Sequence, residues 1–323
     1  MPKAPQRLIE WTGERCVPWT PDVTVAYEHY HRYLWAAALV TGRRVLDLAS
    51  GEGFGAALLA ESAETVTGID IDPRAVEHAR LSYPAPNLTF GAGSALELDE
   101  FADDSFGAVV AFELIEHLSD HERFLAELDR VLAPDGVAIV STPDTLVYSE
   151  GKDAEPNPFH QRELTKAEFR DRLRTRFEHV ALWGQRAADG SRIAAIDEAG
   201  TARPQAFVLQ RDGDGWRPAG EWRPVYLIAV ASHVGGFEAP AESNLVDPEL
   251  GLVVAKEREL VETRHRKALA EQDVAALRPG ADFLQSLYAG GNRARFRWAL
   301  AASPLGDLVR RLRGPRRPSA PGG

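Results

Sequence analysis

The sequence has a single cysteine, no long apolar run and no apolar amino-terminal segment, and each absence excludes a class of protein. One cysteine, Cys16, excludes a disulfide within the chain and is typical of a reducing compartment. No stretch of the 323 residues approaches the length of a membrane-spanning helix, and residues 1–5 lack the apolar core of a secretion signal. We therefore expect a cytoplasmic protein.

The net charge of −11 is unevenly distributed along the chain. Residues 290–323 contain eight arginines and one acid, Asp307, for a net charge of +7, which leaves −18 on the remainder. An acidic body argues against a nucleic-acid partner. The basic tail has one apolar helix face, which predicts either a peripheral membrane or protein contact or packing on the main domain. That face consists of Leu305, Leu308, Val309 and Leu312.

An apolar run that contains an acid is followed by three glycines at alternate positions. Residues 45–48 read Val-Leu-Asp-Leu, and Gly51, Gly53 and Gly55 precede an alanine-rich stretch at 56–60. Strand, glycine turn and helix in this order open a nucleotide pocket at the carboxyl edge of a doubly wound sheet. Glycines allow a ligand to approach bare backbone, and the helix amino terminus offers unpaired N–H groups. A turn that binds nothing is the alternative.

A second acid supports the reading of the glycine turn as a ligand site. Residues 65–70 form an apolar run that ends in Asp70, 19 residues after Gly51. This separation is close to the roughly 20 residues expected for a carboxylate that accepts hydrogen bonds from ribose hydroxyls. Asp70 could instead cap the helix that opens at Pro73, but Asp72 is better placed for that role.

Two motifs resemble those of class I S-adenosylmethionine (SAM)-dependent methyltransferases. The first is Asp47 with the glycine turn, whose spacing differs from the G-x-G-x-x-G of nicotinamide enzymes. The second is Phe-Glu-Leu-Ile-Glu-His-Leu at 112–118, preceded by Asp-Ser-Phe at 104–106, and it is similar to methyltransferases that act on hydroxyls. The resemblance is close over residues 40–145 and loose over residues 10–235, and it gives no information about residues 236–323.

The resemblance implies a set of cofactor-binding residues at or beyond the carboxyl ends of the first four strands, where such sheets bind ligands. Where many relatives have Gly-Asp-Ala near the adenine, residues 93–95 of this chain read Gly-Ser-Ala, so the expected partner is an uncharged hydroxyl. The implied residues are Asp47 for the amino-acid portion of SAM, Ala49 elsewhere in the cofactor site, Gly51 and Gly53 for close backbone approach, Asp70 for the ribose, Ile71, Ser94 and Ala95 for the adenine, and Phe112 for the methionine arm.

Methyl transfer to a hydroxyl requires removal of a proton, and His117 is the candidate base, supported by Glu113. Glu113, Glu116 and His117 share one face of a short turn, and His160 belongs to the segment that returns after the fifth strand. This pattern resembles the magnesium site of small-RNA 2′-O-methyltransferases and implies Mg²⁺ or Mn²⁺ on these four residues. Alternatively, the two glutamates only hydrogen-bond backbone and organise the pocket.

The alternation of strands and helices predicts an α/β fold: a doubly wound, mostly parallel, seven-stranded Rossmann-like sheet in residues 1–235, with a helical extension in 236–323. Residues 237–248 are typical of a linker, 249–277 of an exposed or self-associating helix that could form a homodimer, and 313–323 of a disordered end. Strands are expected at 44–48, 65–70, 88–90, 107–112, 136–141, 179–184, 205–210 and 224–231, and helices at 27–40, 74–80, 121–131 and 166–174.

The combined expectation is a SAM-dependent methyltransferase whose acceptor is a hydroxyl of a sugar, glycan or sugar-containing metabolite. Residues 27–33 and 157–162 resemble segments that flank the core in methyltransferases of bacterial glycans and nucleotide sugars. The aromatic side chains of 27–35 could stack on a sugar or cover SAM, or could simply pack a helix on the sheet. N- or O-methylation of another small natural product, RNA 2′-O-methylation and a non-enzymatic SAM-binding scaffold are the alternatives.

Overall fold

The computed structural model describes two short amino-terminal pieces, most of the main domain and a few later residues. The described residues are 16–17, 20, 22–148, 157–187, 191–195, 209–212, 215–218, 223–237, 239–245, 263, 266, 267 and 271. The contacts divide the chain into two compact units, 1–249 and 250–323. The expectations for 249–277, the basic tail and the carboxyl-terminal end lie almost entirely outside the described residues. No helix of the described part is long and apolar enough to cross a membrane.

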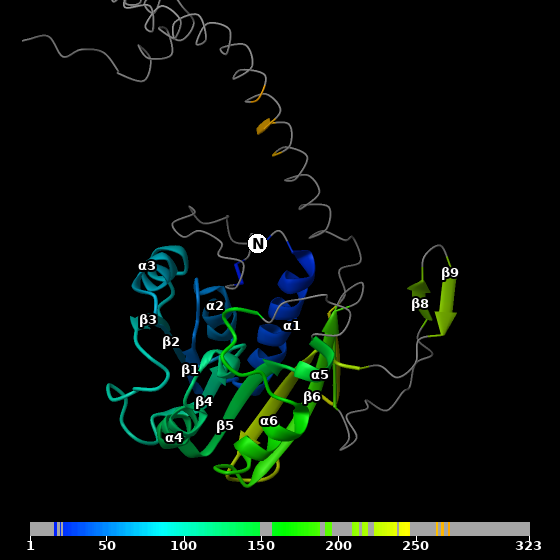
Figure 1. Ribbon diagram of the computed structural model, residues 1–323. Coiled ribbons are helices and arrows are strands. Elements are labelled where there is room, and N and C mark those ends of the chain that lie inside the picture. The colour runs from blue at the N-terminus through cyan, green and yellow to red at the C-terminus, as the bar shows by residue number, and fades with distance from the viewer. Residues whose placement is uncertain are drawn as a thin grey trace, which may run out of the picture. The chain divides into compact units, whose positions relative to one another are not determined.

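A mixed sheet forms the centre of the first unit (Figure 1). Its first five strands run parallel in the order β3-β2-β1-β4-β5, and β10 then runs antiparallel between β5 and β6. The strands are β1 (Arg44–Leu48), β2 (Thr65–Asp70), β3 (Leu88–Ala92), β4 (Phe106–Ala111), β5 (Leu132–Pro143), β6 (His179–Ala187) and β10 (Tyr226–Ser232). The predicted seven-stranded, mostly parallel sheet is therefore present.

Two further strands extend this sheet beyond the prediction. β7 (Ser191–Ala195) pairs antiparallel with β6, and β11 (Glu242–Leu245) pairs antiparallel with β7, which gives nine strands. The assignment of 237–248 to a linker was wrong at β11, because a four-residue edge strand of mixed polarity has no alternation long enough to detect. Residues 209–210 of the predicted 205–210 strand belong to β8 (Leu209–Asp212), which pairs only with β9 (Gly215–Pro218); residues 205–208 lie outside the description.

Helices cover both faces of the sheet, and a separate apolar cluster fills each interface. The helices α1 (Val23–Leu39), α2 (Phe54–Ala60) and α3 (Pro73–Ser82) pack on one face, and α4 (His121–Val131) and α6 (Lys166–Leu173) pack on the other. Because the central strands are buried on both faces, their sequences are nearly continuous apolar runs.

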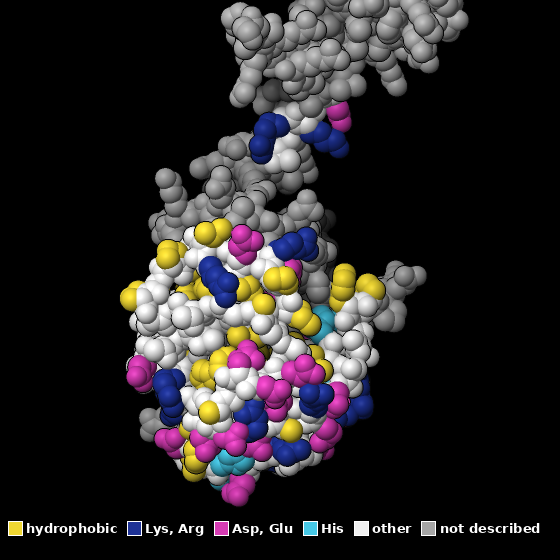
Figure 2. Space-filling model, turned by 90° about the vertical axis from the view of Figure 1, so that its left-hand side faces the viewer, with side chains coloured by type: hydrophobic (Ala, Val, Ile, Leu, Met, Phe, Trp, Pro, Cys, Tyr) yellow, Lys and Arg dark blue, Asp and Glu magenta, His cyan; other side chains and the backbone are white. Residues whose placement is uncertain are grey.

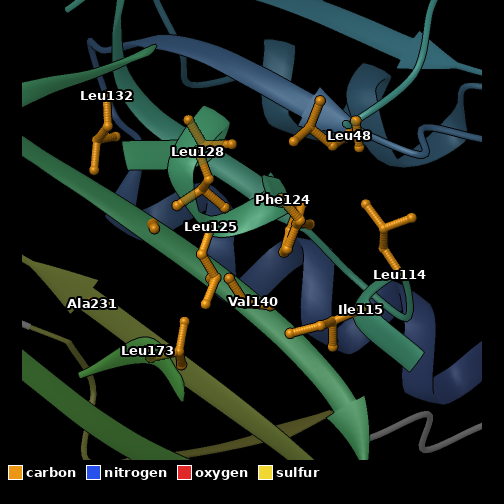
Figure 3. Close-up of a cluster of buried hydrophobic side chains, with 14 of the residues drawn as sticks. Leu48, Leu114, Ile115, Phe124, Leu125, Leu128, Leu132, Val140, Leu173 and Ala231 are labelled. Atoms are coloured by element: carbon orange, nitrogen blue, oxygen red, sulfur yellow. The ribbon is translucent and has the colours of Figure 1, made fainter. Parts of the chain in front are cut away.

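The cluster beneath α4 supports the segment that carries the candidate base (Figure 3). Phe124, Leu125 and Leu128 of α4 are fully buried at the spacing of one helix face. Ile115, in the short 3₁₀ helix η1 (Ile115–His117), and Leu114 point into the same cluster. The apolar members of the Leu-Ile-Glu-His sequence therefore anchor the turn in the core and leave its polar members at the sheet edge.

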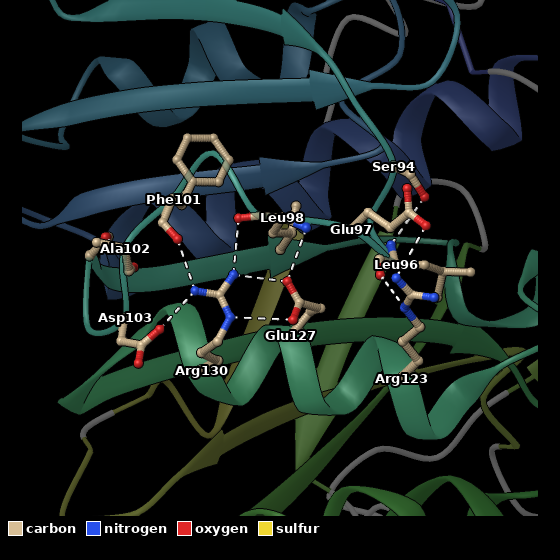
Figure 4. A network of polar contacts seen from close by, with 11 residues as sticks. Ser94, Leu96, Glu97, Leu98, Phe101, Ala102, Asp103, Arg123, Glu127 and Arg130 are labelled. Atoms are coloured by element: carbon tan, nitrogen blue, oxygen red, sulfur yellow. Dashed lines mark hydrogen bonds and ion pairs between the residues drawn. The ribbon is translucent and has the colours of Figure 1, made fainter.

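Arginine side chains of α4 fasten the loop that follows β3 (Figure 4). Arg130 donates to the carbonyl oxygens of Leu98 (3.0 Å) and Phe101 (2.8 Å) and pairs with Asp103 and Glu127. Arg123 donates to the carbonyl oxygen of Leu96 at 2.7 Å. The loop that was expected near the adenine is thus fixed by α4. On the face shown in Figure 2, acidic and basic side chains are interspersed, with no uniformly basic surface.

Candidate active site

A cleft of about 900 Å³ lies at the carboxyl edge of the parallel strands. Its walls come from α1, the glycine turn, the ends of β2, β4 and β5, the short helix α5 (Thr145–Tyr148) and the start of β10. Tyr226 reaches this edge although it begins its strand, because β10 is antiparallel and pairs Tyr226 with Pro143 at the end of β5. The lining residues are Cys16, Val25, His29, Tyr33, Ala49, Ser50, Gly51, Phe54, Asp70, Ile71, Asp72, Arg74, Phe112, Glu113, Leu114, Glu116, His117, Pro143, Tyr148, Phe159, His160 and Tyr226.

The glycine turn requires left-handed backbone at three of five positions. Ala49, Gly51 and Gly53 have φ values of 56°, 59° and 101°. A Cβ atom at Gly53 would lie 2.7 Å from Ala79 Cβ and 3.0 Å from the Phe90 ring, so only glycine fits there. Gly51 lines the cleft, whereas Gly53 packs against α3 and β3 behind the cleft.

Asp70 joins the glycine turn to the start of α3. Its Oδ2 accepts from the backbone N–H of Gly51 (2.8 Å) and its Oδ1 from that of Asp72 (2.9 Å). Asp72, and not Asp70, caps α3 by accepting from Arg74 N at 3.0 Å, as predicted. Asp70 lines the cleft beside Ile71, whose side chain is 79 % exposed. An oriented carboxylate next to an uncovered apolar side chain fits a ribose and a flat base.

Asp47 lies beneath the cleft and is not part of its wall. The side chain is fully buried, and Tyr33 Oη donates to Oδ1 at 3.2 Å. Burial raises the pKa of Asp47 to about 8, assisted by the charge of Asp70 and opposed by the Tyr33 hydrogen bond. Asp47 thus holds Tyr33, which does line the cleft.

Of the other predicted cofactor residues, some line the cleft and some do not. Ala49 and Phe112 line the cleft with Gly51, Asp70 and Ile71. Ser94 and Ala95 do not, and the Ser94 hydroxyl accepts from Leu96 N at 3.2 Å within its own turn. The aromatic residues of α1 mainly pack: Trp35 lies 5.2 Å from Trp183 and Tyr30 lies 5.2 Å from Phe54 between ring centroids.

Glu113 is held in a strained conformation at the end of β4. Its φ is 49°, which is uncommon for a residue with a side chain. Ser141 on β5 stabilises this conformation twice, because its hydroxyl donates to Glu113 Oε1 (2.6 Å) and accepts from Glu113 N (3.1 Å). Arg32 on α1 adds an ion pair between Nη1 and Oε1 of 2.8 Å.

Arg32 is the main site residue that the sequence analysis missed. Its fully buried guanidinium lies 4.9 Å from the Tyr226 ring centroid and donates to Gln185 Oε1 at 2.8 Å. Glu28, one helical turn earlier, is also buried, and burial raises its pKa to about 7 despite the nearby Arg32 charge. The sequence did contain a signal for this pair: Glu28 and Arg32 are four residues apart in a segment rich in aromatic residues.

Glu116, His117 and His160 form a compact cluster, with one candidate ligand atom of each within 4.8 Å of the others. Glu116 is fully buried: its Oε2 accepts from Thr142 Oγ1 at 3.1 Å, and no described residue hydrogen-bonds its Oε1. Burial, followed by the charge of Glu113, raises the Glu116 pKa well above its usual range. Glu113, the fourth predicted ligand, is not in this cluster and is engaged by Arg32 and Ser141.

The two histidines differ in their hydrogen bonds. His117 Nδ1 lies 2.9 Å from the carbonyl oxygen of Phe159, which can only accept, so Nδ1 is the donor of this hydrogen bond. His160 contacts Glu163 through Nδ1 (2.7 Å) and Asn157 Nδ2 through Nε2 (3.1 Å). The side-chain oxygen Oδ1 of Asn157 accepts from Phe159 N. This contact orients the side-chain amide so that its Nδ2 donates to His160. His160 would have to leave Asn157 to bind a metal through Nε2.

The sequence shows clear similarity to known methyltransferases. Residues 46–140 match the family model described as a methyltransferase domain. A probable S-adenosylmethionine-dependent methyltransferase of Mycolicibacterium smegmatis is 41 % identical over 246 residues, 75 % of this chain and 92 % of that protein. One from Mycobacterium tuberculosis is 38 % identical over 55 % of this chain and 64 % of its own length. A phthiotriol/phenolphthiotriol dimycocerosates methyltransferase of Mycobacterium leprae is 34 % identical, with 40 % and 50 % covered.

The similarity to the M. smegmatis protein spans nearly the whole of that relative. The residues that match the family model include the glycine turn, Asp70 and the β4 motif. The geometry agrees, since the turn and Asp70 meet at the carboxyl edge of the sheet beside a cleft large enough for a nucleoside and a second molecule. The chain belongs to the S-adenosylmethionine-dependent methyltransferases.

Proposed function

We propose that this methyltransferase acts on a hydroxyl group of a sugar, a glycan or a sugar-containing metabolite, with His117 as the base. SAM supplies an activated methyl group, so the protein has to hold the hydroxyl in line and accept its proton. The observation that carries the proposal is the hydrogen bond from His117 Nδ1 to the Phe159 carbonyl oxygen. It fixes the orientation of an imidazole on the cleft wall, and imidazole is the side chain best suited to accept a proton near neutral pH.

Glu113 has a supporting role in this proposal. Its Oε1 already accepts from Ser141 and pairs with Arg32, so the carboxylate is better suited to accept a hydrogen bond than to take a proton. The aromatic side chains of Tyr148 and Phe159 lie on the same wall, and Phe159 is 52 % exposed. Aromatic faces beside an acceptor carboxylate suit a ring that carries several hydroxyls.

A divalent metal on Glu116, His117 and His160 is the alternative way to activate the hydroxyl. The buried Oε1 of Glu116, which has no hydrogen-bond partner among the described residues, and the nearby imidazole of His117 fit such an ion. The contacts of His160 with Asn157 and Glu163 fit it less well. A bound Mg²⁺ or Mn²⁺ would lower the pKa of the acceptor hydroxyl.

A lipid hydroxyl is the second candidate acceptor. The M. leprae relative is named for phthiotriol and phenolphthiotriol dimycocerosates, which points to a lipid acceptor for that protein. Two exposed apolar side chains in this chain favour the same class: Phe159 on the cleft wall and Leu146, which is 60 % exposed in the helix that carries Tyr148.

The proposal is tested by transfer of labelled methyl from SAM to a panel of methyl glycosides, a phenol and a long-chain alcohol, with products identified by mass spectrometry. We expect a methyl ether of a glycoside. His117→Gln should lower kcat by about 10²–10⁴-fold while SAM affinity in calorimetry is retained. The matched control is His179→Ala, because His179 is exposed on β6 and away from the cleft wall.

Three results separate the candidates. Transfer to the alcohol or phenol but to no glycoside would replace the sugar with a lipid acceptor. Loss of turnover after chelation, restored by Mn²⁺ or Mg²⁺, would favour the metal, whereas insensitivity to chelation leaves His117 as a plain base. Full activity of His117→Gln would contradict both assignments of His117.

A further inference from the structure

Glu52 lies between the glycines of the nucleotide turn, yet its side chain points away from the cleft. The residue is fully buried and is absent from the cleft wall, whereas Gly51 beside it lines that wall. A buried carboxylate is costly unless hydrogen bonds compensate for the lost water. Contact with a ligand therefore does not explain why a buried carboxylate occupies this position in the turn.

The carboxylate of Glu52 is bound by the carboxyl-terminal end of α3. Tyr83, the C-cap residue of α3, donates its hydroxyl to Oε1 at 2.9 Å and to Oε2 at 3.0 Å. His78 Nε2 lies 3.0 Å from Oε2. Burial lowers the His78 pKa, so this histidine contacts Glu52 as a neutral donor. Phe54 N, at the start of α2, donates to Oε1 at 3.1 Å.

The same helix is attached to the turn at its other end. Asp70 accepts from Gly51 N and from Asp72 N, the N-cap of α3. Between these two attachments, Gly53 packs so closely on Ala79 of α3 that no Cβ could be accommodated. The turn and α3 are thus joined by polar contacts at both ends and by close packing in the middle.

We propose that Glu52 is a positioning residue for SAM. By holding the turn to the end of α3, it fixes the distance between the backbone of Gly51 and the pair Asp70–Ile71, which precedes α3. These are the groups expected to contact the methionine and ribose portions and the base. Without the Glu52 contacts, the three left-handed residues of the turn, Ala49, Gly51 and Gly53, lose the restraint that selects their conformation. Cofactor affinity then falls, while the base on η1 is unaffected.

The test is calorimetric titration of SAM and of S-adenosylhomocysteine into the full chain at a temperature well below the unfolding midpoint of each variant. Glu52→Ala should weaken both ligands by about tenfold or more, because Tyr83, His78 and Phe54 N lose the carboxylate that joins them to the turn. Glu52→Gln should remain within about threefold of wild type, since its amide oxygen still accepts from Tyr83 and neutral His78 can change tautomer. In turnover assays the KM for SAM should rise while kcat changes little.

The matched control is Glu77→Ala, which removes an exposed acid from α3 one residue before His78. It should bind SAM like wild type. If Glu52→Ala does not fold, Tyr83→Phe decides the question, because it removes one hydroxyl and keeps the ring; SAM affinity should fall about threefold or more. Wild-type affinity in folded Glu52→Ala, or in Tyr83→Phe when the alanine variant fails, would overturn the proposal, as would a loss confined to kcat.

Discussion

Arg32 Nη1 lies 2.8 Å from Glu113 Oε1, and the arginine side chain is completely shielded from solvent. The pair joins the helix before the sheet to the strained residue that lies two positions after β4, with Ser141 hydrogen-bonded to both partners. Removing one partner of a buried ion pair leaves the other charge without compensation, and the protein loses more stability than the pair itself contributes.

Arg32→Met should therefore lower the free energy of unfolding by about 3–5 kcal/mol, measured by urea denaturation. The double variant Arg32→Met/Glu113→Gln should recover part of this loss, because no charge is left unpaired. As a control, Arg74→Met removes an exposed arginine that pairs with Asp72, and it should change stability by less than about 1 kcal/mol. Equal losses in the single and double variants would contradict the account.

Stability should fall as the pH rises through the neutral range, and Asp47 should contribute to this slope. Burial raises its pKa to about 8 from an ordinary 3.8, so between these values the folded protein keeps a proton that the unfolded chain has released. The contribution is full below about pH 4 and is lost as the pH rises towards 8, by up to about 1.4 kcal/mol per pH unit.

Urea denaturation of wild type and Asp47→Asn at pH 5, 6, 7 and 8 checks this expectation, and the asparagine variant should have the shallower slope. Glu28, whose pKa is about 7, adds a similar slope below pH 7, so Glu28→Gln is the comparison. The interval from pH 7 to 8 separates the two residues. Parallel stability curves for wild type and Asp47→Asn would show that the carboxyl titrates normally.

Arg130 should matter more to stability than Arg123, although both fasten the same loop to α4. The Arg130 side chain is 28 % exposed and contacts two backbone carbonyls and two acids, whereas Arg123 is 52 % exposed. We expect Arg130→Ala to cost about 1.5–3 kcal/mol and Arg123→Ala less than about 1 kcal/mol. Chemical denaturation measures both, and similar losses would mean that the carbonyl contacts of Arg130 add nothing.

Gly53→Ala and Gly42→Ala separate backbone strain from steric overlap. Both glycines have positive φ, but an added Cβ at Gly42 meets nothing within 4 Å, whereas at Gly53 it meets Ala79 and Phe90. Gly42→Ala should cost about 1–2 kcal/mol for the left-handed backbone alone. Gly53→Ala should cost at least about 2 kcal/mol more and should weaken SAM binding, as thermal unfolding and calorimetry would show. Equal losses of unfolding free energy in the two variants would contradict a steric overlap at Gly53.

The sequence predicted the structure best where the apolar periodicity is regular and where glycine or capping residues mark the ends of elements. The helix at 121–131 was predicted with its observed bounds, and the glycine turn and Asp70 meet at the sheet edge as their spacing indicated. The cofactor contacts of Asp47 and Ser94 stay predictions. Both were placed near SAM by resemblance, but neither lines the cleft. Which side of a residue meets a ligand depends on packing from distant segments, such as Tyr33 on Asp47.

Arg32 shows a second limit. Its partners Glu113, Ser141 and Gln185 come from three separate strands or strand ends, and no local pattern in α1 indicates that they converge. The strands β7 and β11 were missed for a different reason. β7 pairs with the neighbouring β6 and with β11, which begins 47 residues after β7 ends, and strands of five and four residues carry little periodic signal.

The reversed direction of β10 determines where the domain can vary. β6 ends, and β10 begins, at the same edge of the sheet as the cleft, because Tyr226 pairs with Gln185 on one side and with Pro143 on the other. After β6 the chain forms β7, which pairs back onto β6, and it returns to the cleft edge at Tyr226. Insertions or deletions between β7 and β10 can change the length of this connection while β5, β10 and β6 keep their register. The glycine turn and Asp70 belong to β1 and β2 on the other half of the sheet, so such changes leave them in place.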